Sequence, residues 1–395
     1  MMGVKIMILD ECDVLVVGCG LSGSVIARYF AEKGKKVMIW ERRDHVGGNM
    51  YDFIDDHGII VHKYGPHVFH TYDKKIKDYV EQFGKWTEFK VCCRVEMLGK
   101  LTPSPFNFQT IDDYYEKDEA ERLKKKLLKF YSGREEATIV EMLTSDEEDI
   151  KKYADFLYKN DYSLYTAKQW GISPNEIDPS VLRRVPVYFS YKDGCFEDTY
   201  QMVPIKGYTE WFNNLLDHKN ITLKLGQDAL LRIRISDNKI LIDNHEFNGL
   251  VIYTGPIDEL FECKYGSLPY RSLTFRWEYE EGKRHQPTPL VVNPAAKDYT
   301  RVTEYAYFPH ERIDNGKSSY AYECPMQYER NSGMEPYYPI QTAESAEKYE
   351  EYAALADRVQ NLVCAGRLAK FKYFNMDQAL ASALEICNRI DSMET

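Results

Sequence analysis

A glycine-rich turn between an apolar run and an amphipathic helix constrains the fold of this chain most strongly. Residues 13–18 (DVLVVG) are apolar and β-branched, as in a buried parallel strand. A helical pattern follows from about Ser22 to Lys33, and Gly34 is suited to its carboxyl end. The run KVMIWE then forms a second strand that ends at Glu41. The first 41 residues therefore predict one βαβ unit after a short leader.

The turn itself has the dinucleotide-binding spacing G-x-G-x-x-G, at Gly18, Gly20 and Gly23. The first glycine permits the tight turn, the second lets a pyrophosphate approach the backbone, and the third lets helix and strand pack closely. Glu41 ends the second strand at the expected distance, where its carboxylate can accept hydrogen bonds from ribose hydroxyls. Because a 2′-phosphate would be repelled there, NADP is disfavoured.

Two further segments favour a flavin over a nicotinamide. The stretch ERRDHVGGN (41–49) resembles the acid, basic residue and double glycine of FAD-dependent enzymes of the glutathione-reductase-like superfamily. VCAGR (363–367) and NMDQA (375–379) resemble their closing segment, in which an arginine reaches the pyrophosphate and a helix N-terminus faces the flavin. We therefore predict FAD as the cofactor. The predicted cofactor-binding residues are Gly18, Gly20, Ser22, Gly23, Glu41, Arg42, Gly48, Asn49, His67, Arg367 and Met376.

The remaining elements predict a discontinuous α/β domain with two inserted parts. Strand-like runs at 250–254 and 361–365 resemble pieces of the same parallel sheet, and a helix begins at about Met376. Residues 110–160 have helical spacing and little glycine, whereas 185–200 and 268–325 alternate as antiparallel strands do. The predicted boundaries are 10–88, 201–262 and 340–395 for the Rossmann-like FAD domain, 110–182 for the helical bundle, and 89–109, 183–200 and 263–339 for the antiparallel β-sheet domain.

Composition narrows the possible functions. The 395 residues carry 51 Lys and Arg against 62 Asp and Glu, and this net charge of −11 argues against a general nucleic-acid binder. No apolar run is long enough for a membrane span, and the run at the amino terminus ends at Asp10 and Glu11. The nine cysteines form no C-x-x-C or Cys/His cluster, so we expect free thiols, no metal site and a cytoplasmic location.

Many short motifs, in order along the chain, resemble those of the UDP-galactopyranose mutases. They are VHKYGPHVFHT (61–71), YTAKQW (165–170), RRVPV (183–187), DTYQMVPIKGYT (198–209), YTGPID (253–258), YRSL (270–273), YTRVTE (299–304), EPYYP (335–339) and AGRLAKFKYFNMDQ (365–378). The resemblance implies interconversion of UDP-galactopyranose and UDP-galactofuranose with no net redox change. It also implies reduced FAD whose N5 attacks the anomeric carbon while UDP leaves, a homodimer, and a supply of galactofuranose for glycans.

The resemblance also assigns roles to individual residues. Arg184 and Arg301 match the two arginines that clamp the diphosphate, and His70 matches a histidine beside the flavin. These three are the predicted catalytic residues, and Arg184 lies in a stretch (about 171–187) that resembles the mobile lid of the family. Guanidinium suits the diphosphate because its planar fork bonds phosphate oxygens in pairs. The predicted substrate-binding residues are Tyr165 beneath uracil, Trp170 near the ribose, Asn293 near the sugar, Tyr338 and Tyr373 on the phosphates, Asn375, Arg184 and Arg301.

One departure and three alternatives remain open at this stage. Cys195 stands where family members commonly carry a tyrosine that reaches the diphosphate. A true flavin oxidoreductase would share the FAD segments and would oxidise its substrate; a binding protein like the GDP-dissociation-inhibitor relatives would share the fold and be colourless. A mutase that prefers an N-acetylated or different UDP-hexose cannot be separated by sequence.

Overall fold

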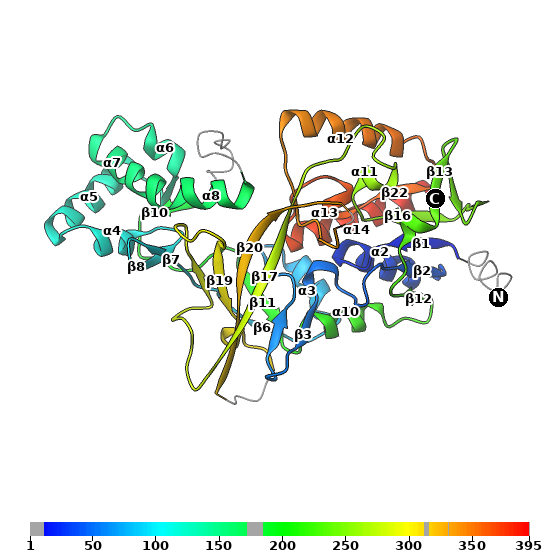
Figure 1. Ribbon diagram of the computed structural model, residues 1–395, viewed down its shortest axis with the longest axis horizontal. Helices are drawn as coiled ribbons and strands as arrows, with labels where there is room; N and C mark the ends of the chain where they lie inside the picture. The colour runs from blue at the N-terminus through cyan, green and yellow to red at the C-terminus, as the bar shows by residue number, and fades with distance from the viewer. Residues whose placement is uncertain (1–11, 172–184, 312–315, 331, 395) are drawn as a thin grey trace.

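The computed structural model describes residues 12–171, 185–311, 316–330 and 332–394. Three parts lie side by side along the longest axis of the molecule (Figure 1). A group of helices is at one end, a long sheet is in the middle, and an α/β part with a parallel sheet is at the other end. No helix in the described part of the chain is both long and apolar enough to cross a bilayer.

The α/β part is built on five parallel strands in the order β12–β2–β1–β16–β22. In the register of this sheet, Val14 faces Val37 on one side and Leu250 on the other. The strands span Val14–Val17 (β1), Val37–Trp40 (β2), Ile221–Lys224 (β12), Leu250–Tyr253 (β16) and Leu362–Cys364 (β22). The sheet is assembled from segments far apart in sequence, which confirms the predicted discontinuous α/β fold.

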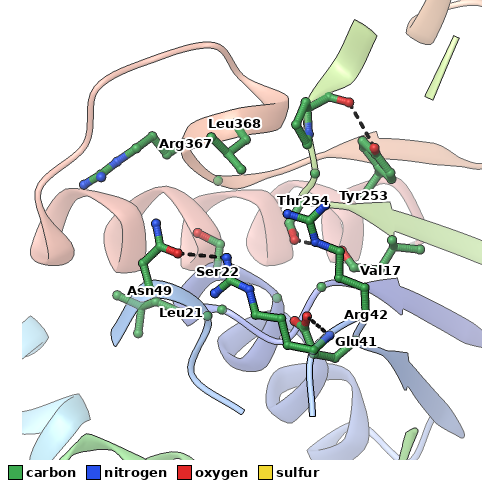
Figure 2. A pocket seen from close by; sticks show the side chains of 18 of the residues that line it. Val17, Leu21, Ser22, Glu41, Arg42, Asn49, Tyr253, Thr254, Arg367 and Leu368 are labelled. Atoms are coloured by element: carbon green, nitrogen blue, oxygen red, sulfur yellow. Dashed lines mark hydrogen bonds between the residues drawn. The ribbon is translucent and has the colours of Figure 1, made fainter. Parts of the chain in front are cut away.

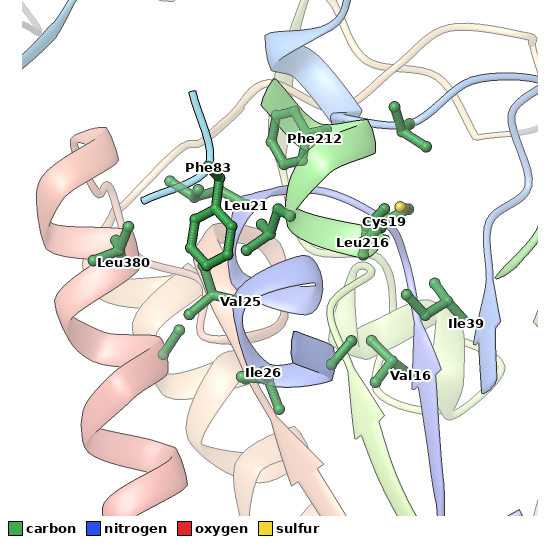
Figure 3. Packing of buried hydrophobic residues seen from close by; sticks show 14 of the residues in the cluster. Val16, Cys19, Leu21, Val25, Ile26, Ile39, Phe83, Phe212, Leu216 and Leu380 are labelled. Carbon is green, nitrogen blue, oxygen red and sulfur yellow. The ribbon is translucent and has the colours of Figure 1, made fainter. Parts of the chain in front are cut away.

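Both faces of this sheet are buried, and for this reason the strands read as continuous apolar runs. One face packs against α2 (Leu21–Glu32), α10 (Tyr208–Leu216) and α14 (Met376–Glu394). Figure 3 shows Val25 of α2 between Leu380 of α14 and the strand residues Val16 and Ile39. The other face packs against α11 (Ile257–Leu260), α12 (Ala343–Ala356) and the antiparallel strands β13–β15 (Ile233–Ser236, Lys239–Ile242, His245–Glu246).

The middle sheet has seven strands in the order β21–β17–β20–β19–β18–β7–β8. They span Cys93–Met97 (β7), Lys100–Ser104 (β8), Tyr270–Glu281 (β17), Leu290–Val292 (β18), Arg301–Glu304 (β19), Lys317–Gln327 (β20) and Tyr338–Pro339 (β21). All pairs are antiparallel except β18 with β7, so the sheet is mixed rather than purely antiparallel as predicted. The alternation of side chains places Arg301 and Val292 on one face, and Val302 and Val291 on the other.

The helical part packs around its own apolar core. Its helices are α4 (Phe108–Tyr114), α5 (Lys117–Phe130), α6 (Ile139–Leu143), α7 (Glu148–Leu157) and α8 (Ser163–Trp170), with a π-helical turn, η2 (Tyr158–Tyr162), joining α7 to α8. The start of the segment 183–200, which was predicted to belong to the antiparallel sheet domain, pairs elsewhere. β10 (Pro186–Tyr188) does not join the seven-stranded sheet but pairs with β9 (Glu136–Thr138) of the helical part.

Smaller elements connect the three parts. A three-stranded sheet, β5–β11–β6, lies between the α/β part and the seven-stranded sheet. The remaining elements are η1 (Gly48–Met50), β3 (Asp52–Ile54), β4 (Ile60–His62), β5 (Phe69–Thr71), α3 (Lys74–Glu81), β6 (Trp86–Glu88), β11 (Tyr200–Pro204), η4 (Ala229–Leu231), η5 (Tyr305–Tyr307) and α13 (Gly366–Ala369).

Candidate functional site

The turn between β1 and α2 has two positions that only glycine can occupy. Gly18 has a φ of +100°, and a Cβ there would lie 2.1 Å from Thr254 Oγ1. A Cβ on Gly23 would lie 2.1 Å from the carbonyl oxygen of Gly18. Because neither glycine carries a side chain, the turn can lead directly into the N-terminus of α2. The first N–H groups of a helix have no partner within it and carry a positive partial charge, so this end of α2 favours an anion.

The Glu41 carboxylate holds the turn in place. Glu41 follows β2 and is 5% exposed. Its Oε2 accepts a hydrogen bond from the Cys19 N–H (2.8 Å), and its Oε1 accepts one from the Arg43 N–H (2.9 Å). Each carboxylate oxygen has two lone pairs, so Glu41 can brace the turn and still accept from a ligand.

One cavity gathers every residue that the sequence predicts to bind the cofactor. It encloses about 1240 Å³ when its open mouth is counted. Figure 2 shows Asn49 and Arg367 on one side of it and Glu41 and Arg42 on the other. The predicted residues that line it are Gly18, Gly20, Ser22, Gly23, Glu41, Arg42, Gly48, Asn49, His67, Arg367 and Met376, together with Asn375 from the substrate set.

Arg43 lines the same cavity and was missed by the sequence analysis, which selected Arg42. The Arg43 Nη2 donates to Asn49 Oδ1 (2.9 Å) and bonds Glu335, and its guanidinium lies 4.7 Å from the centre of the Tyr64 ring. The other terminal nitrogen, Nη1, is buried and has no hydrogen-bond partner among the described residues. A buried donor of this kind costs free energy until an acceptor reaches it. In the sequence, the only indication of this role is that two arginines are adjacent, and that pattern does not show which of them points into the cavity.

His67 is a neutral histidine in the cavity wall. Its Nδ1 lies 2.8 Å from the carbonyl oxygen of Gly65, which requires a proton on Nδ1 and leaves Nε2 as an acceptor. Burial lowers the pKa of His67 to about 4, and the nearby charges of Arg367 and Arg301 act in the same direction. At neutral pH this side chain therefore adds no charge to the site.

Arg367 connects the cofactor cavity with two tyrosines of the predicted substrate set. Its guanidinium carbon lies 5.4 Å from the ring centre of Tyr338 and 5.1 Å from that of Tyr373, and the two rings stack at 5.8 Å. Its terminal nitrogens donate to the carbonyl oxygens of Tyr337 (3.2 Å) and Phe374 (2.5 Å). The position of Arg367 is thus set by both the chain before β21 and the chain before α14.

Arg301 forms an ion pair with Glu323 on the adjacent strand. The register of β19 and β20 places the two residues opposite each other. Glu323 is 2% exposed, and the Arg301 side chain keeps 24% exposure. Although burial opposes the charge, Glu323 and neighbouring tyrosines keep the pKa of Arg301 above its ordinary value. The result is a guanidinium fixed on one face of the seven-stranded sheet.

Tyr165 and Tyr338 stand beside this guanidinium. Both interact with the charge of Arg301, Tyr165 from α8 and Tyr338 from β21. Burial raises the pKa of each phenol, so both hydroxyls keep their protons and can act as hydrogen-bond donors. The structure therefore brings together four predicted substrate residues, because Tyr373 stacks on Tyr338.

Two other predicted residues have different surroundings. Asn293 is on the opposite face of the seven-stranded sheet, where its amide donates to Glu96 (3.0 Å) and its Oδ1 accepts from the Ala296 N–H (2.9 Å). His70 does not line the cofactor cavity. Its Nδ1 contacts the Asp198 carboxylate (2.9 Å), and its ring stacks on Phe196 at 3.8 Å.

The predicted lid falls mainly outside the described residues. Arg184 lies there, and the Trp170 side chain is not described, so neither can be placed relative to Arg301. Cys195 is described and packs in the apolar cluster that contains Cys93.

Lys168 of α8 was also missed by the sequence analysis. Its Nζ donates to the carbonyl oxygens of Asn293 (3.0 Å) and Tyr299 (2.8 Å), which ties α8 to the sheet.

Comparisons with known proteins agree with this arrangement. The family model for UDP-galactopyranose mutase matches residues 160–373, and the model for an NAD(P)-binding Rossmann-like domain matches residues 16–83. A Klebsiella pneumoniae protein named probable UDP-galactopyranose mutase is 34% identical, over 95% of this chain and 94% of its own length. An Escherichia coli protein named dTDP-fucopyranose mutase is 35% identical, over 94% and 96%.

Solved structures agree on the fold. The crystal structure of a reduced UDP-galactopyranose mutase superimposes with a TM-score of 0.72. The match covers 97% of this chain and 96% of that one, at 15% sequence identity. At such a low identity the superposition concerns the fold alone.

Proposed function

The chain belongs to the UDP-galactopyranose mutase family, and we propose that it interconverts UDP-galactopyranose and UDP-galactofuranose with FAD held in its reduced state. One observation carries the proposal: Arg367 lines the dinucleotide cavity and also packs against Tyr338 and Tyr373. The predicted cofactor site and the predicted diphosphate site therefore share a wall. A sugar bound through its diphosphate at Tyr338 would lie next to a cofactor in the cavity.

The residues of the cavity suit FAD. A Cβ at Gly18 or Gly23 would fill the turn against which a pyrophosphate would lie. The unpartnered Nη1 of Arg43 offers a buried donor to an acceptor group. Gly18, Gly20, Arg43, Arg367 and the N-terminus of α14 at Met376 would hold the cofactor. When bound and reduced, the flavin would supply a nucleophilic N5 for the anomeric carbon of the sugar.

The other residues bind and orient the substrate. Arg301, fixed by Glu323, would neutralise charge on the diphosphate, both in the bound sugar nucleotide and in the UDP that leaves. The hydroxyl groups of Tyr338 and Tyr373 would donate hydrogen bonds to phosphate oxygens. Tyr165 offers a ring on which the uracil base can stack. The chain would thus act chiefly by positioning the sugar and by stabilising the leaving group.

A second candidate substrate is the dTDP-linked 6-deoxy sugar of the E. coli relative, because that protein is as similar to this chain as the named UDP-galactopyranose mutase is. Both substrates are sugars on a pyrimidine nucleoside diphosphate. Arg301 and Tyr165 would serve either one, since they would contact the diphosphate and the base. We favour the UDP-linked sugar as donor of galactofuranose for glycans, because the motifs along the whole chain resemble those of the UDP-galactopyranose mutases.

The decisive experiment is anaerobic incubation of the FAD-loaded protein with UDP-galactofuranose, with and without dithionite, followed by separation of the two UDP-sugars. A parallel reaction starts from the furanose form of dTDP-fucose. We expect UDP-galactopyranose to form only after reduction, without stoichiometric consumption of reductant. Conversion of the dTDP-sugar alone would assign the second substrate. Oxidised sugar with reduced flavin as product would instead identify an oxidoreductase.

A further inference from the structure

The cofactor cavity continues beyond Glu41 into a part whose wall is largely apolar. Trp40, Ala229 and Leu230 line the cavity and pack in one apolar cluster of the α/β part. The Gln227 N–H donates to the Glu41 carbonyl oxygen (2.8 Å), so the segment that carries Ala229 and Leu230 runs beside Glu41. Because the Glu41 carboxylate is expected to accept from a ribose, the base on that ribose would lie against this wall.

Glu259 of α11 places a buried carboxylate in the wall of this cavity. The residue is 7% exposed and lines the cavity. Its Oε1 accepts a hydrogen bond from the Tyr328 hydroxyl (2.8 Å). Its other oxygen, Oε2, accepts no hydrogen bond from the described residues, yet it is not enclosed by protein atoms. Glu259 therefore presents one acceptor oxygen to whatever occupies the cavity.

The surroundings of Glu259 hold the carboxylate in place without occupying Oε2. The Tyr328 N–H donates to the Tyr270 carbonyl oxygen (3.2 Å), and the two rings meet edge to face at 5.9 Å, so the donor to Oε1 is itself fixed. Arg42 is the nearby cation, but its guanidinium bonds Glu335 and makes no hydrogen bond to Glu259. Burial raises the pKa of Glu259, and Tyr328 and Arg42 counteract the rise. A hydrogen-bonded ion pair therefore does not account for this carboxylate.

We propose that Glu259 accepts a hydrogen bond from the exocyclic amino group of adenine and thereby selects an adenine dinucleotide. The inference rests on the FAD site of the proposed function. An ionised carboxylate only accepts hydrogen bonds, and the amino group is the one hydrogen-bond donor of the adenine ring. The pyrophosphate would be repelled by Glu259, and the ribose is expected at Glu41. A base without the amino group would leave Oε2 unpaired in a buried site, so the site would discriminate against that base.

Competition between two dinucleotides for the FAD-loaded protein tests the inference. The competitor is the flavin dinucleotide in which unsubstituted purine replaces adenine, so that it lacks only the amino group. The exchange is brought to equilibrium from both directions, and the bound dinucleotides are released and separated by chromatography. The wild type should prefer FAD by roughly tenfold to a hundredfold, the range expected for a hydrogen bond to a charged group.

Variants of Glu259 connect this preference to the carboxylate. Glu259→Leu should bind the two dinucleotides about equally, because the missing acceptor and the missing donor belong to the same interaction. Glu259→Gln keeps the shape of the side chain but offers only a neutral acceptor, so its preference for FAD should fall below about tenfold. This second variant decides the question if Glu259→Leu does not fold. Glu262→Gln removes an exposed carboxylate three residues farther along the chain and, as the control, should keep the wild-type preference.

The outcomes separate this inference from the proposed function, because the competition does not involve conversion of a sugar. Equal binding of the two dinucleotides by the wild type would overturn the inference alone. A full preference for FAD that persists in the Glu259 variants would do the same, since a purely structural pair of Glu259 and Tyr328 predicts no effect of the base. A wild type that shows the preference but converts no sugar nucleotide would support the role of Glu259 and overturn the proposed function. Binding of neither dinucleotide would overturn both.

Discussion

Arg301 donates from both Nε (2.8 Å) and Nη2 (2.7 Å) to a single oxygen of Glu323, Oε2. The guanidinium is therefore held along one edge, and within the described residues no acceptor bonds its Nη1. The carboxylate is almost fully buried and cannot move away with the arginine. This pair keeps the guanidinium fixed on its face of the sheet before any anion arrives, as electrostatic preorganisation requires.

Replacement of Arg301 by alanine should lower kcat/KM for the sugar nucleotide by about a thousandfold, because about 4 kcal/mol is lost when one partner of a buried charge pair is removed. FAD should remain bound at the wild-type stoichiometry, as judged by the visible absorbance of the purified protein. Arg276→Ala is the matched control, since Arg276 lies on the opposite face of the same sheet. Near-normal turnover of Arg301→Ala would remove Arg301 from the substrate site.

Gly18→Ala should abolish FAD binding. The new Cβ would lie 2.1 Å from Thr254 Oγ1, at a φ of +100°. Gly34→Ala separates the steric clash from the backbone strain, because Gly34 also has a positive φ (+84°) but no atom of the described residues lies within 4 Å of the added Cβ. That variant should lose only about 1–2 kcal/mol of stability and keep its FAD. Yellow Gly18→Ala protein would contradict the assignment of this turn to the cofactor.

Arg43→Met should weaken FAD binding by roughly tenfold to a hundredfold, because the buried Nη1 has no partner among the described residues and would make a charged hydrogen bond to the ligand. Fluorescence titration of the apoprotein with FAD measures this change. Arg134→Met is the control, since Arg134 pairs with Glu141 in the helical part. An unchanged dissociation constant for Arg43→Met would show that Nη1 does not reach the cofactor.

The protein should become less stable as the pH falls from about 6.5 towards about 4. His62 is fully buried, its Nε2 lies 3.2 Å from His310 Nε2, and its Nδ1 accepts from the His67 N–H. Burial lowers the pKa of His62 well below its ordinary value, and that of His67 to about 4. Between about pH 6.5 and about pH 4 the unfolded chain thus binds more protons than the native one.

Each such histidine contributes a slope of up to about 1.4 kcal/mol per pH unit to the free energy of unfolding. Urea unfolding at several pH values, with the FAD concentration held constant, measures the total slope. His62→Gln should reduce that slope, because one of the depressed groups is gone. A slope that is the same with and without His62 would mean that its protonation is not linked to unfolding.

The sequence alone determined the local architecture around the dinucleotide cavity. The βαβ unit, the glycine spacing and the closing segment at 363–379 are short-range patterns, and each depends on the preferences of neighbouring residues. For this reason every predicted cofactor residue lines one cavity in the structure. The order of motifs along the chain likewise indicated the family, although the lid residues such as Arg184 lie outside the described part.

Only the tertiary structure decided which side chains of distant segments meet. A shift of one residue along a strand reverses the face on which a side chain lies, so the pairing of β18 with β19 puts Arg301 on one face of the sheet and leaves Asn293 on the other. Packing also decided the environment of Arg43, whose Nη1 is buried without a hydrogen-bond partner among the described residues. Residue identity determines the chemistry a side chain can perform, but the register of strands and the packing of helices determine where that chemistry is available.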